Sequence, residues 1–101
     1  MPTVLSSPKP EIAREVISLG QSYPNPATAS AIIPYTLPEQ YSKASILLRE
    51  IATGREIRRY ELKRGHSSLN VDLSNLSNGL YLYSLVVDEK PVATKKLAVM
   101  K

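Results

Sequence analysis

The residues that could support catalysis are few and scattered in this chain. His66 is the only histidine, and a Ser-His-Asp set could be assembled only from His66, the adjacent Ser67 or Ser68, and Asp72. Residues that are adjacent in sequence do not have the geometry of a catalytic triad, and we expect His66 in an exposed hairpin loop. There is no cysteine, which excludes a thiol nucleophile and a disulfide framework. The sequence therefore predicts no catalytic residue and no enzymatic activity.

Patterns that would bind a metal or a cofactor are equally weak. Asp72 and Asp88 are isolated, and neither has the spacing of a calcium-binding loop around it. A weak calcium site formed by Asp72 and Asn75 stays open as an alternative. A carboxylate that precedes a polar loop, however, usually accepts hydrogen bonds from nearby backbone N–H groups. We predict no resident metal and no cofactor.

Tyr81 and Tyr83 are the aromatic pair with the most interpretable spacing. Residues two apart on a strand share a face, so this pair could form a platform on which sugar rings stack. Leu85 and Val87 continue the same face, which favours packing of both tyrosines in the core, with their hydroxyl groups at its edge.

The formal charge is +4 and the isoelectric point is about 9.5, which raises the question of nucleic-acid binding. The basic residues are spread along the chain, and neither a glycine-rich phosphate loop nor the aromatic and basic pattern of RNA-binding sheets accompanies them. We expect these charges to lie on a solvated surface and predict no nucleic-acid partner.

The elements that would position these residues are strands. Short segments of β-type composition are separated by turn residues at intervals of about 8–12 residues. The segments predicted as strands are 30–37, 44–51, 56–62, 68–73, 80–88 and 92–100. Residues 11–19 could form either a helical turn or a first edge strand, which Gly20 ends in both cases. The pattern predicts an all-β fold, a sandwich of six or seven strands.

Two of these segments carry more specific predictions. Pro34 has no N–H to donate, which should confine its strand to a sheet edge or to a bulge. The segment from Leu80 to Asp88 is apolar on both faces. Such a strand is either covered on both faces or central in its sheet.

The segment 1–18 differs in character from the rest of the chain. Pro2, Pro8 and Pro10 lie among serines, a composition typical of an extended linker. We therefore divide the chain into a linker or N-terminal extension, 1–18, and one domain, 19–101. The apolar runs are too short to span a membrane, and the segment from Met1 to Pro10 lacks the layout of a signal peptide. The chain is thus either cytoplasmic or part of a longer exported protein.

Four sequence blocks follow one another along the chain. They are Tyr23-Pro24-Asn25-Pro26-Ala27 with Tyr35-Thr36-Leu37-Pro38; Ala44 to Ile51 with Thr53-Gly54-Arg55; Asp72-Leu73-Ser74 with Asn78-Gly79-Leu80-Tyr81; and Val86-Val87-Asp88 with Lys95-Lys96-Leu97. In this order they resemble the C-terminal sorting domains of the type IX secretion system of Bacteroidetes-type bacteria, and the resemblance covers residues 19–101. Glu89 departs from the family pattern, which often has glycine there. This implies either a tolerated turn or a turn type that does not need a positive φ.

The resemblance implies an immunoglobulin-like β-sandwich of about seven antiparallel strands that acts as a non-catalytic secretion signal. It also implies a parent protein with an N-terminal cargo domain, which crosses the outer membrane through the translocon and is cleaved by a sortase-like peptidase. The parent would then be secreted or held at the cell surface. The residues expected to be recognised by this machinery are Lys95, Lys96, Leu97 and Lys101 on the last strand and tail. Those expected to be structural are Pro24, Asn25, Pro26, Gly54, Asp72, Gly79 and Tyr81.

Three alternatives accompany this prediction. The terminal lysines could simply protect an edge strand from pairing with other chains. Two exposed edges could also allow a homodimer. The chain could instead be a cell-surface module that binds carbohydrate or protein through Tyr81, Tyr83 or a loop.

Overall fold

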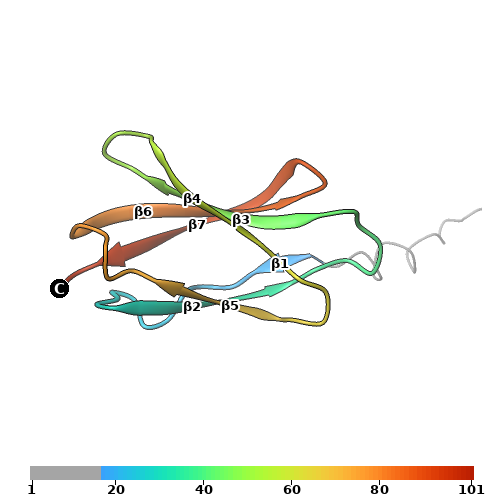
Figure 1. The fold of residues 1–101 in the computed structure, drawn as a ribbon, viewed down its shortest axis with the longest axis horizontal. Coiled ribbons are helices and arrows are strands. Elements are labelled where there is room, and N and C mark those ends of the chain that lie inside the picture. Colours follow the sequence, from blue (N-terminus) through green and yellow to red (C-terminus); the bar gives the residue numbers. More distant parts are fainter. Residues whose placement is uncertain (1–16) are drawn as a thin grey trace, which may run out of the picture.

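Two stacked β-sheets form the domain in the computed structural model, which describes residues 17–101 (Figure 1). One sheet has three strands in the order β1-β2-β5, and the other has four in the order β4-β3-β6-β7. All strand pairs are antiparallel. The strands are β1 (Ser18–Leu19), β2 (Ser30–Thr36), β3 (Ala44–Glu50), β4 (Glu56–Glu61), β5 (Ser68–Asp72), β6 (Gly79–Val87) and β7 (Lys90–Val99). The predicted all-β sandwich of seven antiparallel strands is confirmed.

The described chain includes only the end of the segment 11–19, for which a helical turn and a first edge strand were the alternatives, and residues 11–16 lie outside it. Ser18 and Leu19 form β1, an edge strand paired with Thr36 and Tyr35 of β2. The predicted linker lies outside the described residues, apart from Ile17 and Ser18. Since Ser18 already belongs to β1, the ordered sheet begins one residue before the predicted boundary. No helix within residues 17–101 is long and apolar enough to cross a membrane.

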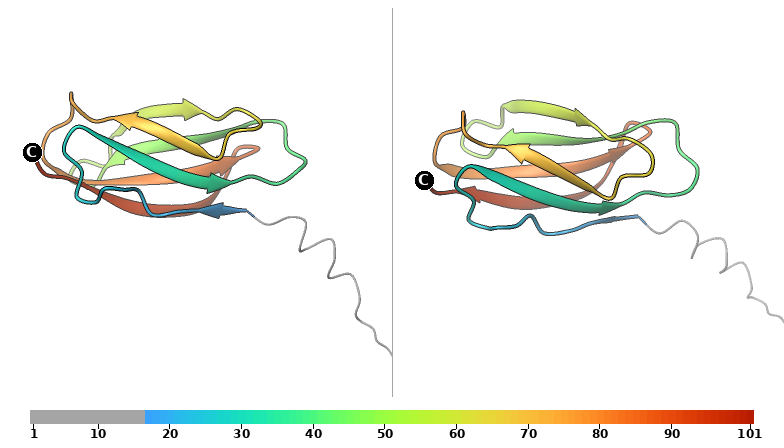
Figure 2. Two further views of the ribbon diagram at one scale, coloured as in Figure 1. Left: turned by 90° about the horizontal axis from the view of Figure 1, so that it is seen from below. Right: turned by 60° about the horizontal axis from the view of Figure 1, so that its bottom comes forward.

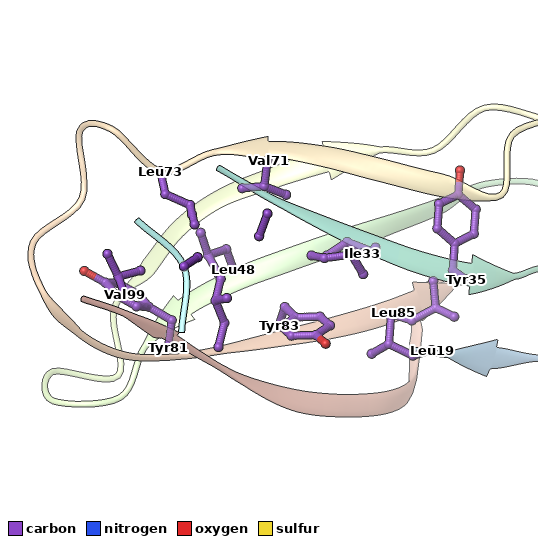
Figure 3. Packing of buried hydrophobic residues seen from close by; sticks show 14 of the residues in the cluster. Leu19, Ile33, Tyr35, Leu48, Val71, Leu73, Tyr81, Tyr83, Leu85 and Val99 are labelled. Carbon is purple, nitrogen blue, oxygen red and sulfur yellow. The ribbon is translucent and has the colours of Figure 1, made fainter. Parts of the chain in front are cut away.

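The core lies between the two sheets and follows the period-two pattern of the strands. In β6, Tyr81, Tyr83, Leu85 and Val87 point inward and are at most 7% exposed. The close-up shows the side chain of Tyr83 next to that of Ile33 from the opposite sheet (Figure 3), and both belong to one hydrophobic cluster. Burying one large apolar side chain contributes about 1.5–3 kcal/mol, so this strand contributes much of the folding free energy.

Within residues 17–101, no further layer covers the second apolar face of β6. β6 lies between β3 and β7, which confirms the central position that its composition predicts. On its outer face, however, Leu80 is 51% exposed, while Leu82 and Val86 are half-buried. The double apolar pattern therefore reflects the central place of the strand in its sheet.

Pro34 lies in β2, the middle strand of the smaller sheet, so the first predicted alternative, a sheet edge, is wrong, and the second, a bulge-like irregularity of the ladder, applies. The sheet tolerates it because the segment beyond β1 shifts by one residue, from the pair Leu19↔Tyr35 to the bridge Tyr23↔Ile32. The missing N–H of Pro34 therefore faces an irregular stretch of its neighbour. There Gly20 donates its N–H to the Pro34 carbonyl at 2.8 Å. A Cβ on Gly20 would lie 2.5 Å from Cγ of Pro34, so this close approach requires glycine.

The hairpin between β6 and β7 turns through Asp88 and Glu89, which have φ values of +50° and +70°. Val87 pairs with Lys90 on either side of them. A two-residue loop with positive φ at both positions is the turn that best matches strand twist, and it favours glycine or asparagine. The alternative that the turn at Glu89 needs no positive φ is therefore wrong, and the turn tolerates a glutamate there.

Candidate recognition surface on the last strand

The residues predicted to be recognised lie in different environments along β7. Lys95 is half-buried and pairs with Tyr83, so it points to the inner side of this edge strand. Lys96 is exposed and pairs with Leu82 on the outer face. Leu97 is 0% exposed and belongs to the core. The structure therefore brings only Lys96 of these three fully to the surface, and the side chain of Leu97 has no access to a partner.

Lys101 joins the end of the chain to the loop between β5 and β6. Its Nζ donates to the carbonyl oxygens of Ser74 at 2.8 Å and Leu76 at 2.6 Å. Its backbone N–H donates to Oδ1 of Asn78 at 2.9 Å. The ammonium group thus satisfies two loop carbonyls and serves an internal, structural role that the sequence pattern did not indicate.

The C-terminal half of the free edge of β7 is covered by the segment that contains the Pro-Asn-Pro motif. Ala27 forms an isolated parallel bridge with Val99. Its N–H donates to the carbonyl of Ala98 at 2.8 Å, and its carbonyl accepts from the N–H of Met100 at 2.9 Å. The last residues of β7 therefore have backbone partners on both sides.

Side chains of the same segment extend this cover. Oδ1 of Asn25 accepts from the N–H of Ala98 at 3.1 Å, and Nε2 of Gln21 donates to the carbonyl of Lys96 at 3.0 Å. Both peptide bonds that precede the prolines of the motif, at Pro24 and Pro26, are cis. The side chain of Asn25 thus takes the place of a backbone acceptor on a neighbouring strand. We call residues 21–27 the sealing segment, because they cover this edge of β7.

Tyr83 anchors the sealing segment from inside the sandwich. Its hydroxyl donates to the carbonyl of Gly20 at 2.8 Å and accepts from the N–H of Ser22 at 2.8 Å. Ser22 is only 2% exposed. Burial raises the pKa of the Tyr83 phenol, and the hydrogen bonds from Ser22 oppose that rise. The interaction joins the first part of the domain to its central strand, which follows much later in the sequence.

The N-terminal half of β7 has no such cover. β1 runs beside β7 (Figure 2), but no backbone hydrogen bond among residues 17–101 crosses the free edge between Lys90 and Thr94. Val92 in this stretch is 44% exposed. Thr94 bonds instead to its own sheet, through a 2.8 Å contact between its hydroxyl and that of Ser84.

The carbohydrate platform predicted as an alternative does not exist in this fold. Tyr81 and Tyr83 are 2% and 0% exposed, which confirms core packing. The hydroxyl of Tyr81 donates to the carbonyl of Ser77 at 2.7 Å, and burial raises the pKa of its phenol. Neither ring has a face available to a sugar.

Asp72 holds the start of the β5–β6 loop. Its Oδ1 accepts from the N–H of Ser74 at 3.0 Å and from the Ser74 hydroxyl at 2.7 Å, as predicted for a carboxylate before a polar loop. These hydrogen bonds lower the pKa of the Asp72 carboxyl. Within residues 17–101 no group of three or more His, Cys, Asp or Glu side chains could hold a metal ion.

The two structural glycines lie where φ is positive. Gly54, at φ +73°, follows Thr53 in the β3–β4 turn, and Gly79, at φ +153°, begins β6 two residues before Tyr81. His66 is exposed, as predicted, in the loop between β4 and β5. This loop is not the expected hairpin, because the two strands belong to different sheets.

Asp88 has a role that the sequence reasoning missed. Its Oδ1 accepts from the N–H groups of Ser42 at 2.7 Å and Lys43 at 3.0 Å. These hydrogen bonds lower the pKa of the Asp88 carboxyl. The carboxylate connects the β6–β7 turn to the loop before β3. No sequence signal indicates that contact, because the partners are far apart along the chain.

Comparison with known proteins agrees with this architecture. The crystal structure of dimeric latent PorU from Porphyromonas gingivalis contains a similar fold, with a TM-score of 0.69 and 22% identity over 84% of this chain. The chain spans only 9% of that protein. No curated protein matches the sequence. The model of one family, described as the secretion system C-terminal sorting domain, matches residues 21–100. The chain therefore belongs to the family of secretion system C-terminal sorting domains.

Proposed function

We propose that this domain is a folded export label, which directs a parent protein across the outer membrane through the type IX secretion system. The observation that carries the proposal is the family match over residues 21–100. The sealed sandwich supports it, because a label must keep one shape while its cargo varies. The domain itself would be non-catalytic, with its polar side chains used to hold loops and strands together.

The partners follow from this role. We propose that the outer-membrane translocon and a sortase-like peptidase act on the domain, and that a cargo domain precedes it in the parent. The parent would be secreted or held at the cell surface. Cleavage would fall in the part of the predicted linker that precedes β1.

The terminal lysines take separate roles in this proposal. Lys96 is exposed on the outer face and is the one we assign to recognition. Lys95 points to the inner side of an edge strand, where a charge opposes pairing with another sheet. Lys101 holds loop carbonyls. The two alternatives for the lysines, recognition and edge protection, would thus apply to different residues.

A reporter fusion tests the export function. The whole chain, Met1 to Lys101, is placed behind a reporter that carries a periplasmic export signal, in a host with type IX machinery. We expect the reporter to reach the cell surface or the medium, whereas a reporter without the domain stays in the periplasm. Retention of the fusion in the periplasm, while a known sorting domain carries the same reporter out, would contradict the proposal.

Charge reversal at single lysines then tests the assignment of roles. Lys96→Glu should reduce export with little change in thermal stability, and Lys63→Glu, an exposed lysine in the β4–β5 loop, is the matched control. Lys101→Gln should mainly lower stability. Equal export by Lys96→Glu and by the control would remove Lys96 from the recognised surface.

A homodimer through edge strands is a separate proposal. Within residues 17–101, the outer edges of β4 and β5 and the stretch from Lys90 to Thr94 are the edges we propose for pairing. Light scattering of the purified chain over a concentration series would detect a dimer, and a monomer mass at every concentration would contradict it.

A further inference from the structure

The two sheets differ sharply in charge. β1, β2 and β5 contain no lysine or arginine, and their one charged residue is Asp72. The four-stranded sheet contains six basic residues against three acidic ones. The basic residues are Arg49, Arg58, Arg59, Lys90, Lys95 and Lys96. The positive charge of the sandwich is therefore concentrated on one sheet.

Two of these cations lie in one row across the outer face. Arg49 pairs with Leu82, and Leu82 pairs with Lys96, so the three residues follow one another across β3, β6 and β7. Neighbouring strands are about 4.8 Å apart, which places the backbones of the two cations about 10 Å apart. Neither cation forms an ion pair within residues 17–101. Glu56 lies opposite Arg49 in the strand register, but the two side chains do not form an ion pair.

Exposed apolar side chains gather next to this row. Of the five large apolar residues that are exposed in the described chain, three lie here: Ile51 at 40%, Leu80 at 51% and Met100 at 61%. The N–H of Ile51 donates to the carbonyl of Leu80 at 3.1 Å. Met100 is two residues beyond Ala98, the partner of Leu80. With the half-buried Leu82, these residues form what we call the outer apolar cluster.

We propose that the outer apolar cluster, with Arg49 and Lys96, docks an acidic protein segment that presents an aliphatic side chain between carboxylates. The inference deepens the proposed function, on which it rests, by giving the chemistry of the partner that reads the label. The apolar residues would supply the buried contact. The two unpaired cations would select acidic partners and fix their orientation on the sheet.

The chemistry of this face favours a protein over an anionic membrane. Membrane surfaces attract clusters of about four to eight basic residues, whereas the row across β3, β6 and β7 contains two, Arg49 and Lys96. Proteins that rest at a membrane interface also use tryptophan and tyrosine there, whereas this cluster is aliphatic and carries no aromatic ring.

A binding experiment on the purified chain, Met1 to Lys101, tests the partner chemistry directly. The probe is an acetylated pentapeptide with one leucine between two pairs of glutamates, followed by amide NMR shifts. We expect shifts confined to the rows of Leu80, Leu82 and Lys96, and affinity at least about tenfold lower in Arg49→Glu/Lys96→Glu. The matched control, Lys63→Glu/Lys90→Glu, makes the same change in net charge with exposed residues outside the row and should bind like the parent chain.

Four outcomes of the binding experiments would overturn the inference. The first is shifts that also cover β2 and β5, and the second is equal loss of binding in the control variant. The third is binding to mixed vesicles of phosphatidylcholine and phosphatidylglycerol but not to the peptide, which would assign the face to a membrane. Leu80→Ser, in which both cations are kept, should also weaken peptide binding, and unchanged binding would contradict the role of the apolar cluster. Thermal melts verify that each variant is folded.

The reporter fusion separates this inference from the proposed function. If the parent chain does not export the reporter, the sorting role fails, whatever the peptide experiment shows. If the parent chain exports it and the Arg49→Glu/Lys96→Glu variant does so equally well, the sorting role stands and the docking face is wrong. Loss of export in that variant but not in Lys63→Glu/Lys90→Glu supports both.

Discussion

The two halves of β7 belong to one strand but are held in different ways. From Lys96 onward, the backbone is bonded on one side to β6 and on the other to the sealing segment. From Lys90 to Thr94, only the β6 side is bonded within the described chain. This half also begins at a turn that forces positive φ on Asp88 and Glu89.

The difference shows that an edge strand can be protected without a complete neighbouring strand. Asn25, Ala27 and Gln21 supply the few donors and acceptors that the C-terminal half needs. The N-terminal half lacks such partners within residues 17–101. In our proposal it is protected by charge, from Lys90 at its start and Lys95 just beyond Thr94, a common defence of sheet edges. Four predictions test this contrast, in order of decreasing effect.

Removing the anchor of the sealing segment should have the largest effect. Tyr83→Phe leaves the Ser22 N–H and the Gly20 carbonyl without their buried partner, which typically costs about 1–3 kcal/mol. We expect the free energy of unfolding in urea to fall by that amount. Tyr23→Phe is the control, since Tyr23 is 53% exposed and should change stability little. Equal effects of the two substitutions would show that the Tyr83 hydroxyl does not hold the segment.

Removing the side chain of Asn25 should weaken the cover on the C-terminal half of β7. Asn25→Ala takes away the acceptor for the Ala98 N–H, and a hydrogen bond of this kind contributes about 1 kcal/mol. We expect lower stability and faster hydrogen exchange at Ala98, while the amide of Leu85 in β6 keeps its protection. Asn70→Ala, at an exposed position of β5, is the control. Unchanged exchange at Ala98 would contradict the sealing role.

Removing the backbone strain at Glu89 in the β6–β7 turn should stabilise the N-terminal half of β7. Glu89→Gly places glycine where φ is +70°, and we expect a gain of about 0.5–1 kcal/mol in unfolding free energy. The ion pair between Lys43 and Glu89 is lost in this variant, but both side chains are mostly exposed, so its contribution is small. Glu89→Ala removes the same pair without relieving φ and should not be stabilising. A gain in both variants would point to the charge instead of the backbone.

Low pH should destabilise the β6–β7 turn, which contains Asp88. Hydrogen bonds from Lys43 and Ser42 lower the pKa of Asp88 below its ordinary 3.8. A group whose pKa is lowered by folding stabilises the protein above its unfolded pKa, and this stabilisation is lost as the pH falls through the folded value. The melting temperature should therefore decrease as the pH is lowered below about 4. In Asp88→Asn, the part of this decrease that is due to Asp88 should disappear, while the part that is due to Asp72 should remain. If the melting temperature of the variant depended on pH in the same way as that of the parent chain, Asp88 would not contribute to the acid sensitivity.

Much of the fold could be predicted from the sequence because strand periodicity and turn residues are local signals. The inward row of β6, Tyr81 to Val87, and the loop role of Asp72 follow from residues within a few positions. The contacts of Asn25 with Ala98, Tyr83 with Gly20, and Asp88 with Ser42 do not, because each joins two segments that are distant in the sequence. For the same reason the sequence could not decide between a sheet edge and a bulge at Pro34, since the shift that accommodates this residue lies in another segment.

The candidate site was predicted less well than the fold. Alternation along β7 could have placed Leu97 inside, beside the inward Val99. Nothing local marks Lys101 as a partner of the Ser74 and Leu76 carbonyls. The outer apolar cluster combines residues of β6 with residues just beyond β3 and β7, and only the strand order brings them together.

The sealing segment also has a consequence for the time at which the domain closes. Residues 21–27 are synthesised early in the domain, but the groups they bond to, from Lys96 to Met100, are added only after β1 to β6 are complete. Synthesis adds about 5–20 residues per second, and contacts of such long sequence separation form late in folding. The sandwich therefore cannot be sealed before its last strand has left the ribosome. Any protein carried ahead of this domain is then complete before the domain takes its final shape.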